Sequence, residues 1–266
     1  MNPDEVMRRE VLAPEPAEGL AGVLDIELPD AGTLPPLWHW VYLLDRRPQQ
    51  DLGDDGHPTF GIPAPPGPGR RRMFAGGRLR THRLLRLGEP AVRTTRVLER
   101  KERVGRSGPL TFVTVRHEIT QDDELAVVDD QDLVYRGPGS IADAPTVAGP
   151  VPEPRLDLHV DSALLFRFSA LTYNAHRIHY DRDYARDEGY EDLVVHGPLQ
   201  ALVMAELLRR HNVSLVSRTF AYRLTAPMIG PQRLTVAARE GDIESGAVTF
   251  SERGVVTARG DLRKEP

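Results

Sequence analysis

Alternating apolar and polar positions recur in three consecutive stretches of the first half of the chain, each bounded by turn residues. These stretches are "GRLRTHRLLRLGEPAVRTTRVLERKERVG", "PLTFVTVRHEITQ" and "ELAVVDDQDLVYRG". Alternation combined with β-branched and aromatic residues predicts antiparallel strands. The stretches "RTFAYRLTAPMIGPQRLTVAARE" and "GAVTFSERGVVTARGDL" repeat this style near the end of the sequence. We therefore expect each half of the chain to end in about three strands.

One segment has a clear helical period. It runs from about Pro198 to His211, and a proline suits the first turn of a helix. Its apolar positions recur at helical spacing, at Leu199, Leu202, Val203, Leu207 and Leu208. In the first half, the matching place holds only "LPPLWHWVYLLD", which predicts a short helix opened by prolines, and then a long irregular loop. The two halves are therefore expected to be related but unequal.

Proline and glycine crowd residues 137–154, "GPGSIADAPTVAGPVPEP". Such a stretch cannot carry helical or ladder hydrogen bonds far, so it predicts a linker. The expected organisation is an N-terminal half over residues 1–136 and a C-terminal half over residues 155–266.

Composition excludes several classes of protein. The 266 residues are 40% hydrophobic, which suits a globular core, and the formal net charge of -5 gives no broad basic field for nucleic acid. The absence of cysteine excludes disulfides, a cysteine nucleophile and a thiolate metal site. No apolar run approaches the ~20 residues of a membrane span, and the N-terminus lacks the apolar stretch of a signal peptide. A cytoplasmic protein that does not bind membranes is the expectation.

The residues that can carry chemistry gather in "NAHRIHYDRDYARDEGYEDLVVHGPLQALV", residues 174–203. His176 and His179 are three residues apart, and His196 precedes the Gly197-Pro198 start of the expected helix. Histidine transfers protons near neutral pH. Backbone N–H groups at a helix start can stabilise a developing negative charge, and a glycine there lets a ligand approach. The segment can therefore supply both a proton carrier and an oxyanion donor.

Two motifs carry a resemblance to a known family. "FSALTYNAHRIHYDRDYA" followed by "VVHGPLQALVMAELL" resembles the MaoC-like hotdog hydratases and dehydratases, whose pattern is Asp-x-Asn-Pro-x-His and then a His-Gly helix start. Within them, "LPPLWHWVYLLD", "LGDDGHPTFGIPAPP" and "RRRMFAGGRL" resemble the N-terminal half of the two-domain branch of mesaconyl-CoA hydratase and 3-hydroxyacyl-thioester dehydratase. The resemblance covers roughly residues 30–250. It implies an α+β double hotdog, with an N-terminal half that helps to form the acyl channel and a catalytic C-terminal half.

Carried over by position, the family's catalytic histidine falls on His179, and its catalytic aspartate falls on Asn174. This is a departure, because an amide cannot accept a proton as a carboxylate does. The family's Asn-Pro falls on His176 and Arg177, which adds an imidazole. Two alternatives follow: His179 transfers the proton alone while Asn174 positions water, or His176 shares the task.

Other residues of the motif have plainer interpretations. We expect His196 to shape the helix start beside the substrate rather than to perform chemistry, and Gly197 to be the oxyanion donor, with a tight turn as its alternative. Tyr180 and Asp181 belong to a charged, solvated loop. Trp38 and Trp40 are expected in the core or between the halves, with an acyl pocket as the less favoured alternative.

Arginines are the candidates for binding an anionic ligand, such as the phosphates of coenzyme A or of a carrier-protein arm. They are Arg70, Arg71, Arg72, Arg78 and Arg80 in "GRRRMFAGGRLR", and Arg233 in the second half. Among them Arg78, Arg80 and Arg233, together with His196, are predicted to contact the substrate. A charged surface edge is the alternative for the arginine run.

The resemblance implies a hydro-lyase that hydrates an enoyl thioester or dehydrates a 3-hydroxyacyl thioester without a metal or cofactor. The expected partners are the thioester substrate and further copies of the chain, as in a dimer. One alternative is a metal hydrolase that uses His176, His179 and either Asp181 or His196 as ligands, although a His-x-x-His spacing alone is weak evidence. Another is a non-catalytic thioester-binding subunit, which the missing aspartate makes conceivable.

Overall fold

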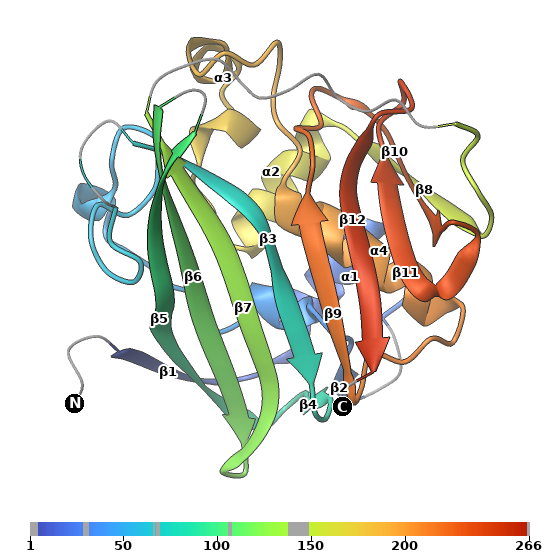
Figure 1. Ribbon diagram of the computed structural model, residues 1–266. Coiled ribbons are helices and arrows are strands. Elements are labelled where there is room, and N and C mark those ends of the chain that lie inside the picture. The colour runs from blue at the N-terminus through green and yellow to red at the C-terminus, as the bar shows by residue number, and fades with distance from the viewer. Residues whose placement is uncertain are drawn as a thin grey trace.

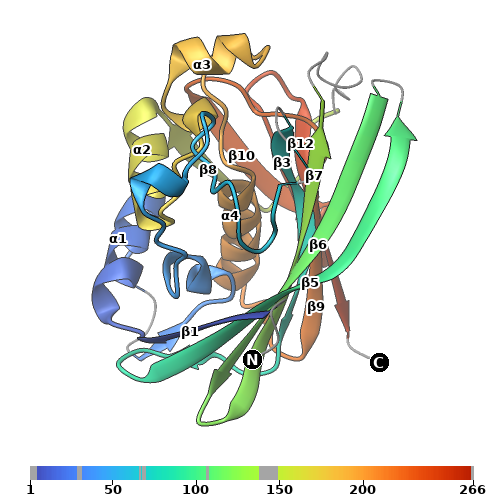
Figure 2. The same ribbon diagram turned by 90° about the vertical axis from the view of Figure 1, so that its left-hand side faces the viewer.

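The computed structural model describes residues 5–28, 32–65, 67, 70–105, 108–137 and 149–264. Its main feature is one twisted ten-stranded sheet whose helices all lie against a single face, as Figures 1 and 2 show in two views. Residues 138–148, most of the predicted linker, lie outside the described residues.

The described residues of the first half form seven strands, one α-helix and two short 3-10 helices (η). In chain order they are β1 (Glu5–Val11), α1 (Pro14–Leu24), β2 (Thr33–Leu34), η1 (Trp38–Val41), η2 (Gln49–Asp51), β3 (Arg71–Thr81), β4 (Leu85–Arg86), β5 (Pro90–Gly105), β6 (Gly108–Gln121) and β7 (Glu124–Arg136).

In the second half, residues 149–264 form five strands, three α-helices and one 3-10 helix. They are β8 (Arg155–Val160), α2 (Ser162–Leu171), η3 (Arg177–His179), α3 (Arg182–Asp187), α4 (Gly197–Arg210), β9 (Arg218–Leu224), β10 (Gln232–Arg239), β11 (Asp242–Phe250) and β12 (Val256–Lys264). The helix predicted for Pro198–His211 is confirmed, one residue earlier at each end, as α4.

The strand order shows that the two halves share one topology. Read outward from the junction of the two halves, the strand order is β3-β7-β6-β5-β1 in the first half and β9-β12-β11-β10-β8 in the second. Each half therefore orders its strands in the same way, and the two meet where β3 pairs antiparallel with β9. All the ladders of this sheet are antiparallel, which confirms the predicted α+β double hotdog.

The halves differ in what fills the concave side of the sheet. In the second half α4 lies across the sheet, and its residues from Leu199 to Leu208 are all buried. In the first half the described residues between α1 and β3 hold only the two-residue strand β2, η1, η2 and irregular chain. The short helix predicted around "LPPLWHWVYLLD" is present as η1, but the described part of the first half wraps no long helix. Space is therefore left on the concave side of the first half.

A single hydrophobic core joins the halves. It includes Leu20 of α1, Trp38 of η1, Phe168 of α2, Leu202 of α4 and Phe220 of β9. Because residues from both halves share this core, neither can move far without disturbing the other. Among the described residues, no helix is both long and apolar enough to span a membrane.

Candidate active site

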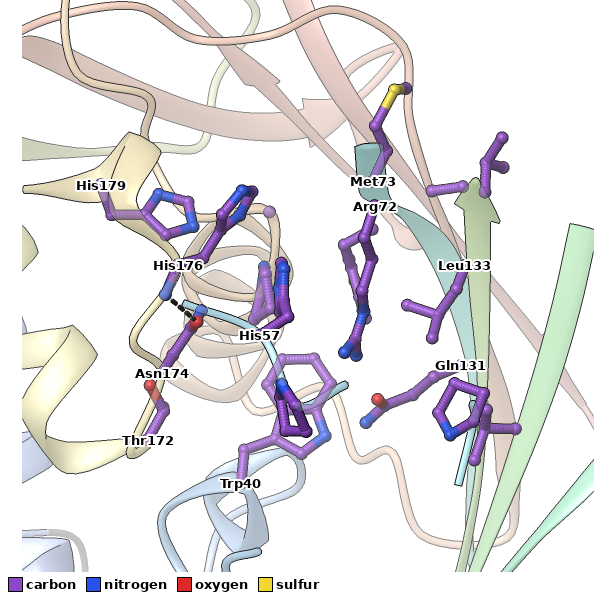
Figure 3. Close-up of a pocket in the computed structure, with 18 of the residues that line it drawn as sticks. Trp40, His57, Arg72, Met73, Gln131, Leu133, Thr172, Asn174, His176 and His179 are labelled. Carbon is purple, nitrogen blue, oxygen red and sulfur yellow. Dashed lines mark hydrogen bonds between the residues drawn. The ribbon is translucent and has the colours of Figure 1, made fainter. Parts of the chain in front are cut away.

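A cavity of about 740 Å³ lies in the space that the first half leaves open. Its size suits a small-molecule ligand. One side is formed by β3 and the concave face of β5 to β7, and the other by the end of α2, η3, the start of α4 and the part of the loop before β3 that carries His57 (Figure 3). Apolar side chains such as Ile62, Phe74, Val115 and Leu133 line much of the wall.

His179 ends η3 and reaches this cavity from the second half. Its Nδ1 lies 2.7 Å from the carbonyl oxygen of Val194, so Nδ1 carries the proton and donates it to this bond. That contact leaves Nε2 as an unprotonated acceptor. Burial lowers the pKa of His179 to about 4, which keeps the ring neutral near pH 7.

His196 and Gly197 lie beside His179 at the start of α4. The rings of His196 and His179 stack with their centroids 3.6 Å apart, and His196 Nε2 is 2.9 Å from the hydroxyl oxygen of Ser169. Gly197 is the first residue of α4 and lines the cavity. Its N–H has no acceptor within the helix and lies at the positive end of the helix dipole. A Cβ at Gly197 would lie 3.1 Å from Phe74 and 3.2 Å from Leu224, so a side chain would crowd this approach.

Asn174 and His176 form the turn that precedes η3. The side-chain oxygen of Asn174 accepts a hydrogen bond from the backbone N–H of His176 at 3.0 Å, and both residues line the cavity (Figure 3). The His176 ring is buried, with its centroid 5.4 Å from that of His179. Burial and then the neighbouring His57 lower the pKa of His176 well below its usual value. Asn174 therefore shapes the turn, and His176 contributes a neutral imidazole.

The structure adds two residues that sequence reasoning missed, Asp55 and His57 of the loop before β3. The two carboxylate oxygens of Asp55 accept hydrogen bonds from the backbone N–H and from ring Nδ1 of His57, each at 2.9 Å. His57 lines the cavity, and its ring centroid lies 4.1 Å from that of His176. Burial and Arg72 lower the pKa of His57, and Asp55 opposes them.

Backbone contacts attach this loop to the turn of the second half. The N–H of Arg177 donates to the carbonyl of Asp55 at 3.0 Å, and its guanidinium donates to the carbonyl of Asp54 at 3.1 Å. Gly56 has a φ of +86°, and a Cβ there would lie 1.8 Å from the carbonyl oxygen of Ala175. The available signal was the Asp-Gly-His run, whose glycine marks either a turn or a close backbone approach.

The Asp55, His57 and His176 side chains also form the group that comes nearest to a metal site among the described residues, with one potential ligand atom each within 4.8 Å of one another. In this structure the carboxylate and the imidazole are hydrogen-bonded to each other instead. Neither set considered from sequence forms such a group among the described residues. Asp181 pairs with Arg177 at 2.7 Å and caps α3, and His196 stacks against His179 with its Nε2 bonded to Ser169.

The arginines divide between the two faces of the sheet. Arg72 lines the cavity, and no hydrogen bond or ion pair involves its side chain among the described residues. Arg78 and Arg80 of β3 instead pair with Asp132 and Asp130. The structure does not bring these two to the cavity, because a bulge between Phe74 and Gly76 reverses which side chains of β3 face inward.

Arg233 lies exposed on β10, opposite His159 of β8, and does not line the cavity either. The predicted packing role is confirmed for Trp38, which is in the core. Trp40 lines the cavity and donates from Nε1 to the buried carboxylate of Asp129 at 2.7 Å. The acyl-pocket alternative therefore suits Trp40 better.

Comparison with known proteins gives consistent matches. The family described as "Hydroxyacyl-thioester dehydratase type 2" matches residues 37–230. Over 240 residues the chain is 47% identical to mesaconyl-C(4)-CoA hydratase of Chloroflexus aurantiacus, covering 85% of this chain and 84% of the relative. Over 271 residues it is 27% identical to the mitochondrial hydroxyacyl-thioester dehydratase type 2 of Schizosaccharomyces pombe, covering 89% and 90%.

Solved structures resemble the chain in fold. HtdX of Mycobacterium tuberculosis has a TM-score of 0.71 at 14% identity and covers 98% of this chain and 100% of its own. A MaoC-like dehydratase of Phytophthora capsici has a TM-score of 0.70 at 11% identity and covers 99% and 97%. At these identities the likeness shows the double hotdog fold alone.

The buried histidines predict loss of stability in mild acid. Burial, and then the nearby Arg93, lower the pKa of His117 to about 4, and burial lowers that of His179 to the same value. An unfolded histidine titrates near 6.5, so the unfolded chain binds more protons between about pH 6.5 and 4, and stability falls as the pH falls through this window. Each such histidine should remove on the order of 2 kcal/mol of unfolding free energy between pH 7 and 5.

Urea unfolding at pH 7 and pH 5 measures this loss. His117→Asn should reduce the difference between the two pH values, whereas His82→Asn, at an exposed position, serves as the control. An equal pH dependence in wild type and His117→Asn would contradict the assignment.

Proposed function

Because the chain belongs to the hydroxyacyl-thioester dehydratase type 2 family, we propose that it is a hydro-lyase acting on acyl thioesters. It adds water to an enoyl thioester or removes water from a 3-hydroxyacyl thioester. One observation carries the assignment beyond kinship: His179, with Nε2 fixed as an acceptor, shares an apolar-walled cavity with the free helix start at Gly197. This pairing provides a proton acceptor and an oxyanion donor within one site.

In the hydration direction, the Gly197 N–H stabilises the thioester oxygen as it gains charge. Nε2 of His179 accepts a proton from water while the water oxygen bonds to the β-carbon. The electron pair of the carbon–carbon double bond moves toward the carbonyl oxygen, and the resulting enolate then takes a proton at the α-carbon. Dehydration follows the same steps in reverse.

Three neighbours position these groups. His196 stacks against His179 and is held by Ser169, so it fixes the face of the imidazole at the start of α4. Asn174 holds the turn through the N–H of His176 and offers its amide N–H groups to water. His196 and Asn174 therefore have positioning roles. For Asn174 the chemistry requires this, because a carboxamide does not exchange the proton that catalysis needs.

For the acyl group, we propose a short enoyl chain that is linked to coenzyme A by a thioester and carries a free carboxylate at its other end. The support is the 47% identity to a protein named mesaconyl-C(4)-CoA hydratase, whose named substrate has a free carboxylate beside its double bond. Arg72 is the matching feature of this chain, since its guanidinium lines the cavity near His57 and has no ion-pair or hydrogen-bond partner in the part of the chain that the structure describes. A guanidinium binds a carboxylate through paired hydrogen bonds. The cytoplasmic location and the homo-oligomeric state remain predictions.

The first kinetic prediction concerns His179. His179→Gln removes the acceptor at water, so we expect kcat to fall by roughly 10² or more, the usual scale of general acid–base catalysis. His176→Gln should lower kcat less, because no carbonyl or carboxylate among the described residues bonds to the His176 ring and fixes its tautomer. Loss of enoyl absorbance with a panel of enoyl-CoA substrates measures both. Near-normal turnover in His179→Gln, with an inactive His176→Gln, would move the assignment to His176.

The second kinetic prediction concerns Arg72. Arg72→Met should raise KM for a carboxylated enoyl-CoA by roughly tenfold or more while changing turnover of an uncharged enoyl-CoA of equal length little, since a paired charge contributes about 1.5 kcal/mol or more. Arg78→Met is the matched control, because it lies on the same strand and pairs with Asp132 outside the cavity. Equal effects of the two substitutions on the carboxylated substrate would refute carboxylate recognition by Arg72.

A further inference from the structure

The mechanism above assigns no residue to supply the proton that joins the α-carbon. Asn174 cannot supply it, because a carboxamide neither gives nor takes a proton near neutral pH. Beside His176 the cavity wall holds a second imidazole that is backed by a carboxylate, His57 with Asp55. Both come from the first half of the chain, which sequence reasoning had left without catalytic groups.

We propose that His57 is the second proton-transfer residue of this site, and that Asp55 is its positioning residue. This rests on the proposed hydro-lyase function and names the group that completes it. Together the pair supplies the carboxylate-backed acid and base that Asn174 cannot provide.

The geometry favours His57 over its neighbour His176 as the second proton-transfer residue. Asp55 accepts from Nδ1 of His57 at 2.9 Å, which fixes the tautomer and leaves Nε2 as the other reactive atom of the ring. A carboxylate in this place also stabilises the imidazolium that forms when Nε2 takes a proton, as in other carboxylate–histidine pairs. Within the described ranges the His176 ring has no hydrogen-bonded carboxylate, and it lies between the rings of His57 and His179, 4.1 and 5.4 Å away.

The loop that carries the pair is held to the second half at several points. Asp55 is fixed at its side chain by His57 and at its carbonyl by the N–H of Arg177. Arg177 opens η3, the 3-10 helix that ends in His179. One short segment of backbone therefore sets the spacing between the two imidazoles that the reaction uses.

The proton count balances in the hydration direction. Water loses a proton to Nε2 of His179 as its oxygen bonds to the β-carbon, and the electron pair of the double bond passes into the enolate. Because the pKa of His57 is lowered, its Nε2 must first take a proton from solvent, with the Asp55 carboxylate as counter-charge. The enolate then forms a C–H bond at the α-carbon with this proton, and His57 returns to neutral imidazole. His179 gains one proton and His57 loses one, so exchange with solvent restores the starting state.

The test compares wild type, His57→Gln, Asn174→Asp and the double variant His57→Gln/Asn174→Asp, with kcat and KM measured on an enoyl-CoA substrate. His57→Gln should lower kcat by roughly 10² or more with KM changed less than about threefold, because proton transfer rather than binding is lost. Asn174→Asp keeps an oxygen that can accept from the N–H of His176, so it should fold, and its own kcat is the reference for the double variant. In the double variant the new carboxylate can carry the proton, and at least tenfold of the lost kcat should return.

Asp55→Asn tests the positioning role. It keeps the shape of the side chain and should lower kcat by roughly tenfold with little change in KM, since the imidazolium loses its counter-charge. His82→Gln, at an exposed position, is the matched histidine control and should match wild type.

Each result bears on a different claim. Near-wild-type kcat in His57→Gln, or a double variant no more active than His57→Gln, overturns the role of His57 while the hydro-lyase function stands. An unchanged kcat in Asp55→Asn overturns the role of Asp55. Loss of wild-type turnover on chelation, restored by a divalent cation, would show that the cluster holds a metal instead. A wild-type protein that turns over no enoyl thioester removes the proposed function itself.

Discussion

The close approach of Gly56 to the carbonyl of Ala175 is the constraint on which this site depends. It joins the loop before β3 to the turn before η3, two segments far apart in the sequence, at a distance that leaves no room for a Cβ. The hydrogen bond from the N–H of Arg177 to the carbonyl of Asp55 lies beside it. Because these are backbone contacts, they place His57 and His179 by main-chain geometry rather than by flexible side chains.

The unequal halves explain why a cavity exists beside this junction. Both halves order five strands in the same way, but among the described residues only the second wraps a long buried helix. The irregular chain of the first half leaves the concave side of β5 to β7 open, and the apolar wall there borders the start of α4. One half therefore provides His179 and the proposed oxyanion donor, and the other provides the space and the carboxylate–imidazole pair.

The sequence predicted the parts of this arrangement that are local. His179, His196 and Gly197 lie within one motif, and the period of apolar residues in α4 follows from burial on all sides. The pairing of Asp55 and His57 with that motif depends on how the two halves pack, so no local pattern contains it. Arg78 and Arg80 were predicted at the substrate because they share a cationic run with Arg72. The bulge at Phe74 and Gly76, which strand alternation cannot predict, places them outside the cavity.

The central claim is that contact between the halves completes the site, and turnover by Gly56→Ala tests it most directly. A Cβ at Gly56 meets Ala175 and strains a φ of +86°, whereas a Cβ at Gly53 in the same loop makes only contacts of 3.4 Å or more. Gly56→Ala should displace His57 and lower kcat by roughly 10² while the hydrophobic core stays folded, because small misplacements of catalytic groups cost rate steeply. Gly53→Ala should retain most of its activity. Equal kcat values for the two variants would contradict the claim.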